Sequence, residues 1–209
     1  MTNILLISFV ITLLYMGIAN RLYSYIVILA LQGIILFGVA FIELIEINTL
    51  NLIFVLLETI IFKTIAIPLF LNYIIKKNGI TRDEEPFLPD FISVINITII
   101  ILGSFLLSNT IHDPHLQKIF FVVALSALFT GLFIIATRRK IITHVMGYLV
   151  IENGVFILSV AVGSEMPMLV NTGILLDIFV SVLVLGIFVN KIGDVLKEQD
   201  VEQLKNLKD

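Results

Sequence analysis

The chain has 209 residues and a formal net charge of -3, and 59% of its residues are hydrophobic while only 14% are charged. Soluble domains carry about a quarter charged residues, so this composition, with a mean hydropathy of +1.10, predicts an integral membrane protein. The small net charge and the lack of a basic cluster interleaved with aromatics argue against a nucleic-acid partner, and the absence of cysteine excludes disulfides and thiolate chemistry.

Seven apolar segments, each bounded by charge, Pro or Asn, come close to the roughly 20 residues that a helix needs to span the hydrocarbon core. We expect them at residues 3–19, 22–45, 49–75, 88–108, 117–137, 141–163 and 167–191. These runs are too long and too continuous for the strands of a membrane barrel. We therefore predict an all-α bundle of seven transmembrane helices, with six helices as the nearest alternative.

Lysine and arginine residues fall almost entirely on one side of such a bundle, and Lys118 is expected on the other side. The basic side holds Arg21, Lys76, Lys77, Arg82, Arg138, Arg139, Lys140, Lys191, Lys197, Lys205 and Lys208. Because positively charged loops remain in the cytoplasm, we expect a multi-pass protein of the cell inner (plasma) membrane, with its N-terminus outside and its C-terminus in the cytoplasm.

The two ends of the chain show an internal repeat. Leu31–Gly33 (LQG) in the second helix corresponds to Ile151–Gly154 (IENG) in the sixth, and Leu56–Glu58 (LLE) in the third corresponds to Leu175–Asp177 (LLD) in the seventh. Both copies enter their second helix from a basic turn on the same side, so the repeats are parallel, unlike the inverted repeats common in transporters.

The repeat divides the chain into four parts. Residues 1–77 form a first three-helix repeat, 78–116 a cytoplasmic loop and connector helix, 117–192 a second three-helix repeat, and 193–209 a cytoplasmic tail. The loop from Asn78 to Pro89 is interpreted as a polar linker. The tail is interpreted as a short amphipathic helix that either docks on a partner or is simply solvated.

Four ionisable residues lie well inside predicted helices: Glu58, Lys63, Glu152 and Asp177. A charge near the bilayer centre costs about 3 kcal/mol on insertion scales, so such residues are usually paired, neutralised or exposed to water. Glu58 and Lys63 are five residues apart, about 140° around an α-helix, so each is expected to find a partner on another helix or on another subunit. One interpretation is an ion pair that fixes helix registration. For the set as a whole we favour a proton relay.

Polar side chains lie between these charges, and we include Gln32 and His144 in the candidate relay. The full polar set is Gln32, Thr59, Thr64, Asn72, His144, Tyr148, Asn153 and Thr172. Such side chains either hold water or pass hydrogen bonds between carboxylates, or they simply bond to the preceding turn or a neighbouring helix. Pro68 is expected to kink the third helix about one turn beyond Lys63.

We expect no metal site and no cofactor in the chain. Only His112, His115 and His144 supply imidazole, and the first two flank Pro114 in a short polar loop. The sequence contains no P-loop, nucleophile elbow or dinucleotide fingerprint, so it shows no catalytic centre of its own.

The segments RRKIITHVMGYLVIENGVFIL, from Arg138 to Leu158, and NTGILLDIFVSVLVLGIFVNKI, from Asn171 to Ile192, resemble component E of the hydrogenase-4 type of energy-converting hydrogenase. The pattern GYxxxENG carries much of this resemblance. It extends to DVEQLKNLK in the tail and to LQG and IIFKTIAIPLFLNY in the first half. The second half also resembles the small K subunit of complex I, which has one membrane glutamate in each of its second and third helices.

These resemblances imply a membrane-arm subunit of a hetero-oligomeric oxidoreductase complex, between antiporter-like subunits and a redox arm that holds the metal centres. Glu152 would take the place of the first glutamate and Asp177 that of the second, while Gln32 in the first repeat cannot titrate. The expected function is proton translocation coupled to electron transfer elsewhere. The alternatives are a subunit of a multisubunit cation/proton antiporter and a structural spacer between antiporter-like subunits. Neighbouring genes would separate the first two.

Overall fold

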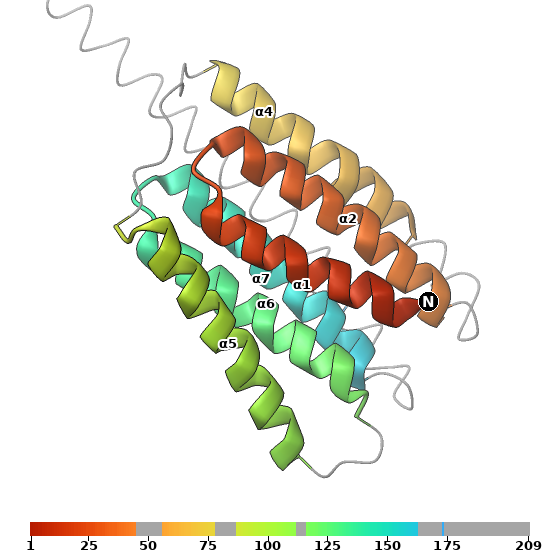
Figure 1. Cartoon of the computed structure of the whole chain (residues 1–209). Helices are drawn as coiled ribbons and strands as arrows, with labels where there is room; N and C mark the ends of the chain where they lie inside the picture. Colours follow the sequence, from red (N-terminus) through yellow and green to blue (C-terminus); the bar gives the residue numbers. More distant parts are fainter. Residues whose placement is uncertain (45–55, 78–86, 112–115, 163–172, 174–209) are drawn as a thin grey trace, which may run out of the picture.

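The computed structural model describes residues 1–44, 56–77, 87–111, 116–162 and 173, and the described segments are mainly helical. The elements are α1 (Thr2–Ile18), α2 (Leu22–Leu44), the π-helix η1 (Glu58–Ala66), α4 (Ile67–Lys77), α5 (Asp90–Thr110), α6 (Lys118–Thr137) and α7 (Ile141–Val162). Figure 1 labels the α-helices along the chain. The π-helix η1 continues directly into α4.

Five of these segments are long and apolar enough to cross a membrane: Leu22–Glu43, Thr59–Lys76, Asp90–Thr110, Lys118–Thr137 and Ile142–Val162. The apolar helix α1 is shorter, with 17 residues. The prediction of an all-α membrane protein is therefore confirmed. Apart from Gly173, the predicted helix at 167–191 and the tail lie outside the described residues, so the count of seven helices and the two repeats remain predictions.

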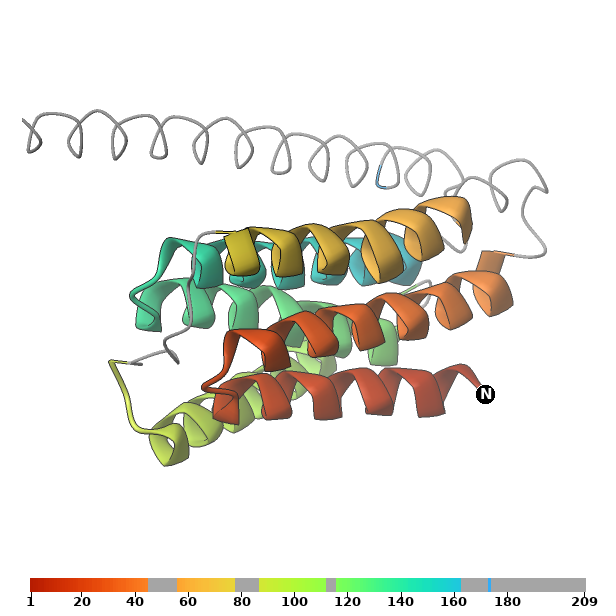
Figure 2. The ribbon, with the colours of Figure 1, turned by 90° about the horizontal axis from the view of Figure 1, so that it is seen from above.

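Helices α6 and α7 pack closely along their length because small residues let their backbones approach. A Cβ atom on Gly131 would lie 2.6 Å from the carbonyl oxygen of Gly147, and one on Gly154 would lie 3.0 Å from that of Ala124. Helices α1 and α2 pack beside this pair, α1 against α6 and α2 against α7. Figures 1 and 2 both show α4 and α5 at opposite edges of the bundle.

The ends of α1 and α6 meet at one end of the bundle. Arg138, which follows α6, donates from Nη2 to the carbonyl oxygen of Gly17 in α1 at 3.3 Å, and Asn20 Nδ2 donates to Asp90 Oδ2 in α5 at 2.7 Å. Because their C-terminal ends meet, α1 and α6 run in the same direction. The basic residues Arg21, Arg138, Arg139 and Lys140 therefore belong to one end, as the sequence predicts. The membrane side that this end faces remains a prediction.

Candidate functional site

The π-helix η1 carries both Glu58 and Lys63. Within it, Thr64 Oγ1 donates to the carbonyl oxygen of Thr59, five residues earlier, at 2.9 Å. Pro68 follows closely and has no N–H, so an α-helical bond to the carbonyl of residue 64 is unavailable. Departures from α-helical winding of this kind are frequent at functional sites. The predicted angle of 140° between Glu58 and Lys63 holds only for an α-helix and is therefore wrong for this π-helix. The side chain of Glu58 lies outside the described residues.

A glycine on α2 brings η1 close to the centre of the bundle. A Cβ atom on Gly33 would lie 2.7 Å from Thr64 Oγ1 and 3.0 Å from the carbonyl carbon of Lys63. The second contact is with backbone, which cannot turn away as a flexible side chain can. The absence of a side chain at Gly33 therefore lets the Lys63 segment lie directly against α2.

Lys63 reaches α7 and meets Glu152 there. The Lys63 Nζ lies 3.8 Å from Glu152 Oε1, and the two side chains are only 4% and 2% exposed. That distance suits an ion pair but exceeds a hydrogen bond. The Lys63 Nζ also donates to Asn153 Oδ1 at 3.2 Å and lies 5.2 Å from the ring centroid of Phe156, a cation–π arrangement. The expectation that Lys63 finds its partner on another helix is thus confirmed.

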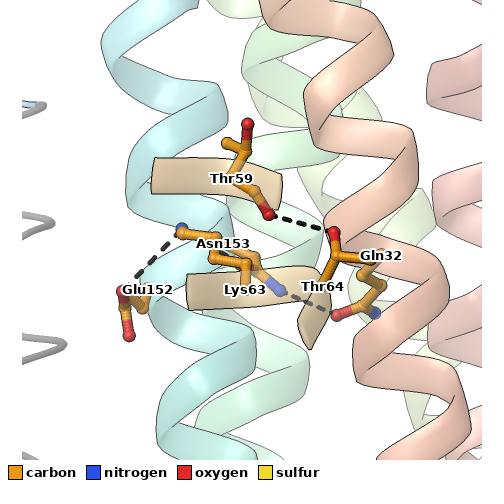
Figure 3. A network of polar contacts seen from close by, with 6 residues as sticks. All are labelled: Gln32, Thr59, Lys63, Thr64, Glu152 and Asn153. Carbon is orange, nitrogen blue, oxygen red and sulfur yellow. Dashed lines mark hydrogen bonds and ion pairs between the residues drawn. The ribbon is translucent and has the colours of Figure 1, made fainter. Parts of the chain in front are cut away.

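Asn153 links Lys63 to α2, and through α2 to α1, by hydrogen bonds. Its Nδ2 donates to Gln32 Oε1 on α2 at 3.0 Å, and Gln32 Nε2 donates to Thr12 Oγ1 on α1 at 3.0 Å. Thr12 Oγ1 in turn donates to the carbonyl oxygen of Phe9 at 2.6 Å. Figure 3 shows the residues from η1, α2 and α7 converging between the helices. A continuous series of polar contacts, all from buried residues, therefore links four helices.

A small cavity adjoins the ion pair. Its lining residues are Leu29, Lys63, Ile67, Leu149, Glu152 and Asn153. The volume of this cavity, counted as the space that the centre of a water molecule can occupy, is about 10 Å³. A single water needs roughly 10–15 Å³ by the same measure. The cavity also has polar groups for such a water, namely the ammonium, the carboxylate and the amide. The site therefore suits one water beside the two charges.

The structure brings together three of the six predicted relay residues, Lys63, Glu152 and Gln32. His144 lies apart at the start of α7, where its Nε2 is 2.7 Å from the carbonyl oxygen of Arg138. The eight residues that separate it from Glu152 correspond to about 12 Å of α-helix. Asp177 lies outside the described residues, as does the side chain of Glu58.

Sequence reasoning missed three features of this region. Asn153 belongs to the predicted polar set but not to the six predicted relay residues, yet it contacts both Lys63 and Gln32. Thr12 was not selected, because one threonine in an apolar helix is not a specific signal. Arg138 was assigned to a basic loop, but it is only 3% exposed and its guanidinium carbon lies 5.8 Å from the ring centroid of Tyr25.

Comparison with known proteins finds distant relatives. The chain is 27% identical over 151 residues to hydrogenase-4 component E of Escherichia coli, a match that covers 71% of this chain and 69% of that protein, and it matches the Shigella flexneri protein equally. It is 22% identical over 185 residues to an uncharacterized protein of Mycobacterium tuberculosis, with coverage of 87% and 84%. No family profile and no solved structure matches the chain. Together with the apolar helices, these similarities indicate a multi-pass membrane protein distantly related to hydrogenase-4 component E.

Proposed function

We propose that this protein is a membrane subunit of a hydrogenase-like, complex I-like assembly and that the Lys63–Glu152 pair takes part in proton transfer driven by electron transfer in partner subunits. The observation that carries this proposal is the buried ion pair itself, held at 3.8 Å beside room for one water. The distant similarity to a protein named as a hydrogenase component supports the class of assembly.

The pair has two accessible protonation states that differ by one proton shift. A proton leaves the Lys63 ammonium for a water in the adjacent cavity, and that water delivers a proton to Glu152, so that both groups become neutral. The reverse step restores the ion pair. The direct distance is too long for a hydrogen bond, which is why the water is needed. In a low-dielectric interior, a charge that arrives nearby changes the balance between these states strongly.

The remaining acids of the predicted relay extend the proposed path. Glu58 lies on the same helix as Lys63, and Asp177 belongs to the predicted seventh helix. His144 lies at the basic end of the bundle and is proposed as the group nearest the aqueous phase at that end. The redox centres are assigned to partner subunits, and antiporter-like subunits are the proposed neighbours in the membrane.

The test is proton translocation by the whole complex in inverted membrane vesicles from a deletion strain complemented with each variant. A chemically reduced low-potential dye serves as electron donor and protons as acceptor, so that hydrogen evolution reports electron flow while acidification of the vesicle interior is measured with a pH-sensitive dye. Glu152→Gln is expected to abolish acidification per electron while the complex stays assembled. The matched control is Glu43→Gln, which makes the same change near the end of α2, away from the site.

Two results would overturn the proposal. Unchanged pumping in Glu152→Gln at equal assembly would leave the ion pair as a structural spacer between helices. Sodium-driven dissipation of an imposed pH gradient, with no dependence on the electron donor, would place the protein in a cation/proton antiporter instead. The same vesicles serve both measurements, so assembly levels are matched.

A further inference from the structure

The direction of every hydrogen bond between Lys63 and α1 is set by one fact, that an ammonium group has donors and no acceptor. Because Lys63 donates to Asn153, the side-chain oxygen of Asn153 must face Lys63, and its NH₂ group must face Gln32. Gln32 then accepts on Oε1 and is left with its NH₂ group toward Thr12. Thr12 accepts from Gln32, so its own proton goes to the carbonyl of Phe9.

This forced orientation has an electrostatic consequence. Both amide dipoles point their oxygen ends toward the Lys63 ammonium, and aligned hydrogen bonds of this kind strengthen one another in a low-dielectric interior. The series stabilises the ammonium through Asn153 Oδ1, in addition to Glu152, without adding a second negative charge. Through Asn153 and Gln32, the series also couples the position of Lys63 to Thr12 on α1.

The same series is a poor path for protons. To pass a proton, each amide would have to accept one on its oxygen and release one from its nitrogen, which converts it to the unfavourable imidic acid form. Beyond Thr12 the series ends at the carbonyl of Phe9, which carries no exchangeable proton to pass on. A relay through Gln32, expected from the sequence, therefore has no onward step among the described residues.

We infer that Asn153, Gln32 and Thr12 are positioning residues, a one-way series of donors that holds the Lys63 ammonium beside Glu152 and closes the site to protons on the α1 side. This inference rests on the proposed proton-transfer function. The orientation of the amides that Lys63 imposes does not depend on that function, and it can be tested without measuring proton translocation.

The informative variant is Thr12→Val, which replaces the hydroxyl with a methyl group of similar size and leaves Gln32 Nε2 without an acceptor. Thr12→Ser keeps the hydroxyl and serves as the conservative rescue. The matched control is Thr130→Val on α6, because Thr130 is also buried and its hydroxyl has no hydrogen-bond partner among the described residues. In the vesicle assay, Thr12→Val is expected to lower the protons translocated per electron about three- to tenfold without abolishing translocation, the order that corresponds to the net contribution of one intramolecular hydrogen bond. Thr12→Ser and Thr130→Val are expected to stay close to wild type.

A thermal measurement on the solubilised complex tests the orientation independently. The drop in unfolding midpoint caused by Thr12→Val is compared in the native and the Lys63→Met backgrounds. Without the ammonium, no described residue requires the oxygen of Asn153 to face position 63, so the Asn153 amide can turn over. Gln32 can then direct its NH₂ group toward the oxygen of Asn153. The drop is therefore expected to shrink in the Lys63→Met background, a non-additivity characteristic of directly coupled residues.

Each result bears on one half of the inference. Equal drops in both backgrounds would overturn the orientation imposed by Lys63. Normal pumping in Thr12→Val, with pumping abolished in Glu152→Gln, would overturn the positioning role, and a loss in Thr12→Val as complete as in Glu152→Gln would instead make the series a proton path. Pumping that survives Glu152→Gln would remove the proposed function, while the thermal comparison would still decide whether the series orients Lys63.

Discussion

Removing the ammonium of Lys63 should be among the most destabilising changes available in this protein. In Lys63→Met the carboxylate of Glu152, only 2% exposed, loses its ion partner, and Asn153 Oδ1 loses its donor. Breaking a buried ion pair from one side costs about 3–5 kcal/mol, whereas removing both charges is often close to neutral. The double variant Lys63→Met/Glu152→Gln should therefore recover most of the stability that Lys63→Met loses.

The assay is the thermal midpoint of the solubilised complex, followed by a fluorescent-protein fusion on size-exclusion chromatography. For a chain of this size, about 1 kcal/mol corresponds to roughly 2–4 °C. Lys63→Met is thus expected to lower the midpoint by on the order of 10 °C. Glu43→Gln, an acid-to-amide change outside the site, provides the reference for an ordinary substitution.

The comparison that decides is Lys63→Met against the double variant. If the two have the same midpoint, the charge on Glu152 is not compensated by Lys63, and the ion pair is not the feature that holds η1 against α7. A Lys63→Met variant as stable as the wild type would lead to the same conclusion.

Two further predictions concern packing and topology. Gly33→Ala should lower the thermal midpoint, since its methyl group would meet the Lys63 backbone and overpacking costs about 1–3 kcal/mol. The control Gly103→Ala, in a position with open space, should be neutral or slightly stabilising. Equal effects of the two variants on the midpoint would contradict the close approach of α2 and η1 at Gly33. Because the chain has no cysteine, single cysteines at Lys76, Lys118 and Lys208 can be labelled with an impermeant maleimide in inverted vesicles. Positions 76 and 208 should react and 118 should not; labelling at 76 but not 208 would indicate six spans.

Sequence alone determined the boundaries of most of the described helices and the end of the bundle at which the described basic turns lie. The predicted segments 22–45, 117–137 and 141–163 match α2, α6 and α7 to within about one residue, and the predicted 88–108 lies two residues before α5. These boundaries are local properties, because the length of an apolar run and the charges that flank it are set by the thickness of the bilayer. For the same reason, the basic turns could be assigned to one end of the bundle.

Only the tertiary structure decided which of the buried polar groups meet. The sequence offered Lys63 three acids, and the structure pairs it with Glu152 and adds Asn153, while His144 lies elsewhere. Such contacts depend on how each helix is rotated and how far it is shifted along its neighbours. Here the close backbone approach at Gly33 and the change from α- to π-helical winding in η1 set that rotation, and neither follows from an apolar pattern that looks the same at every rotation of the helix.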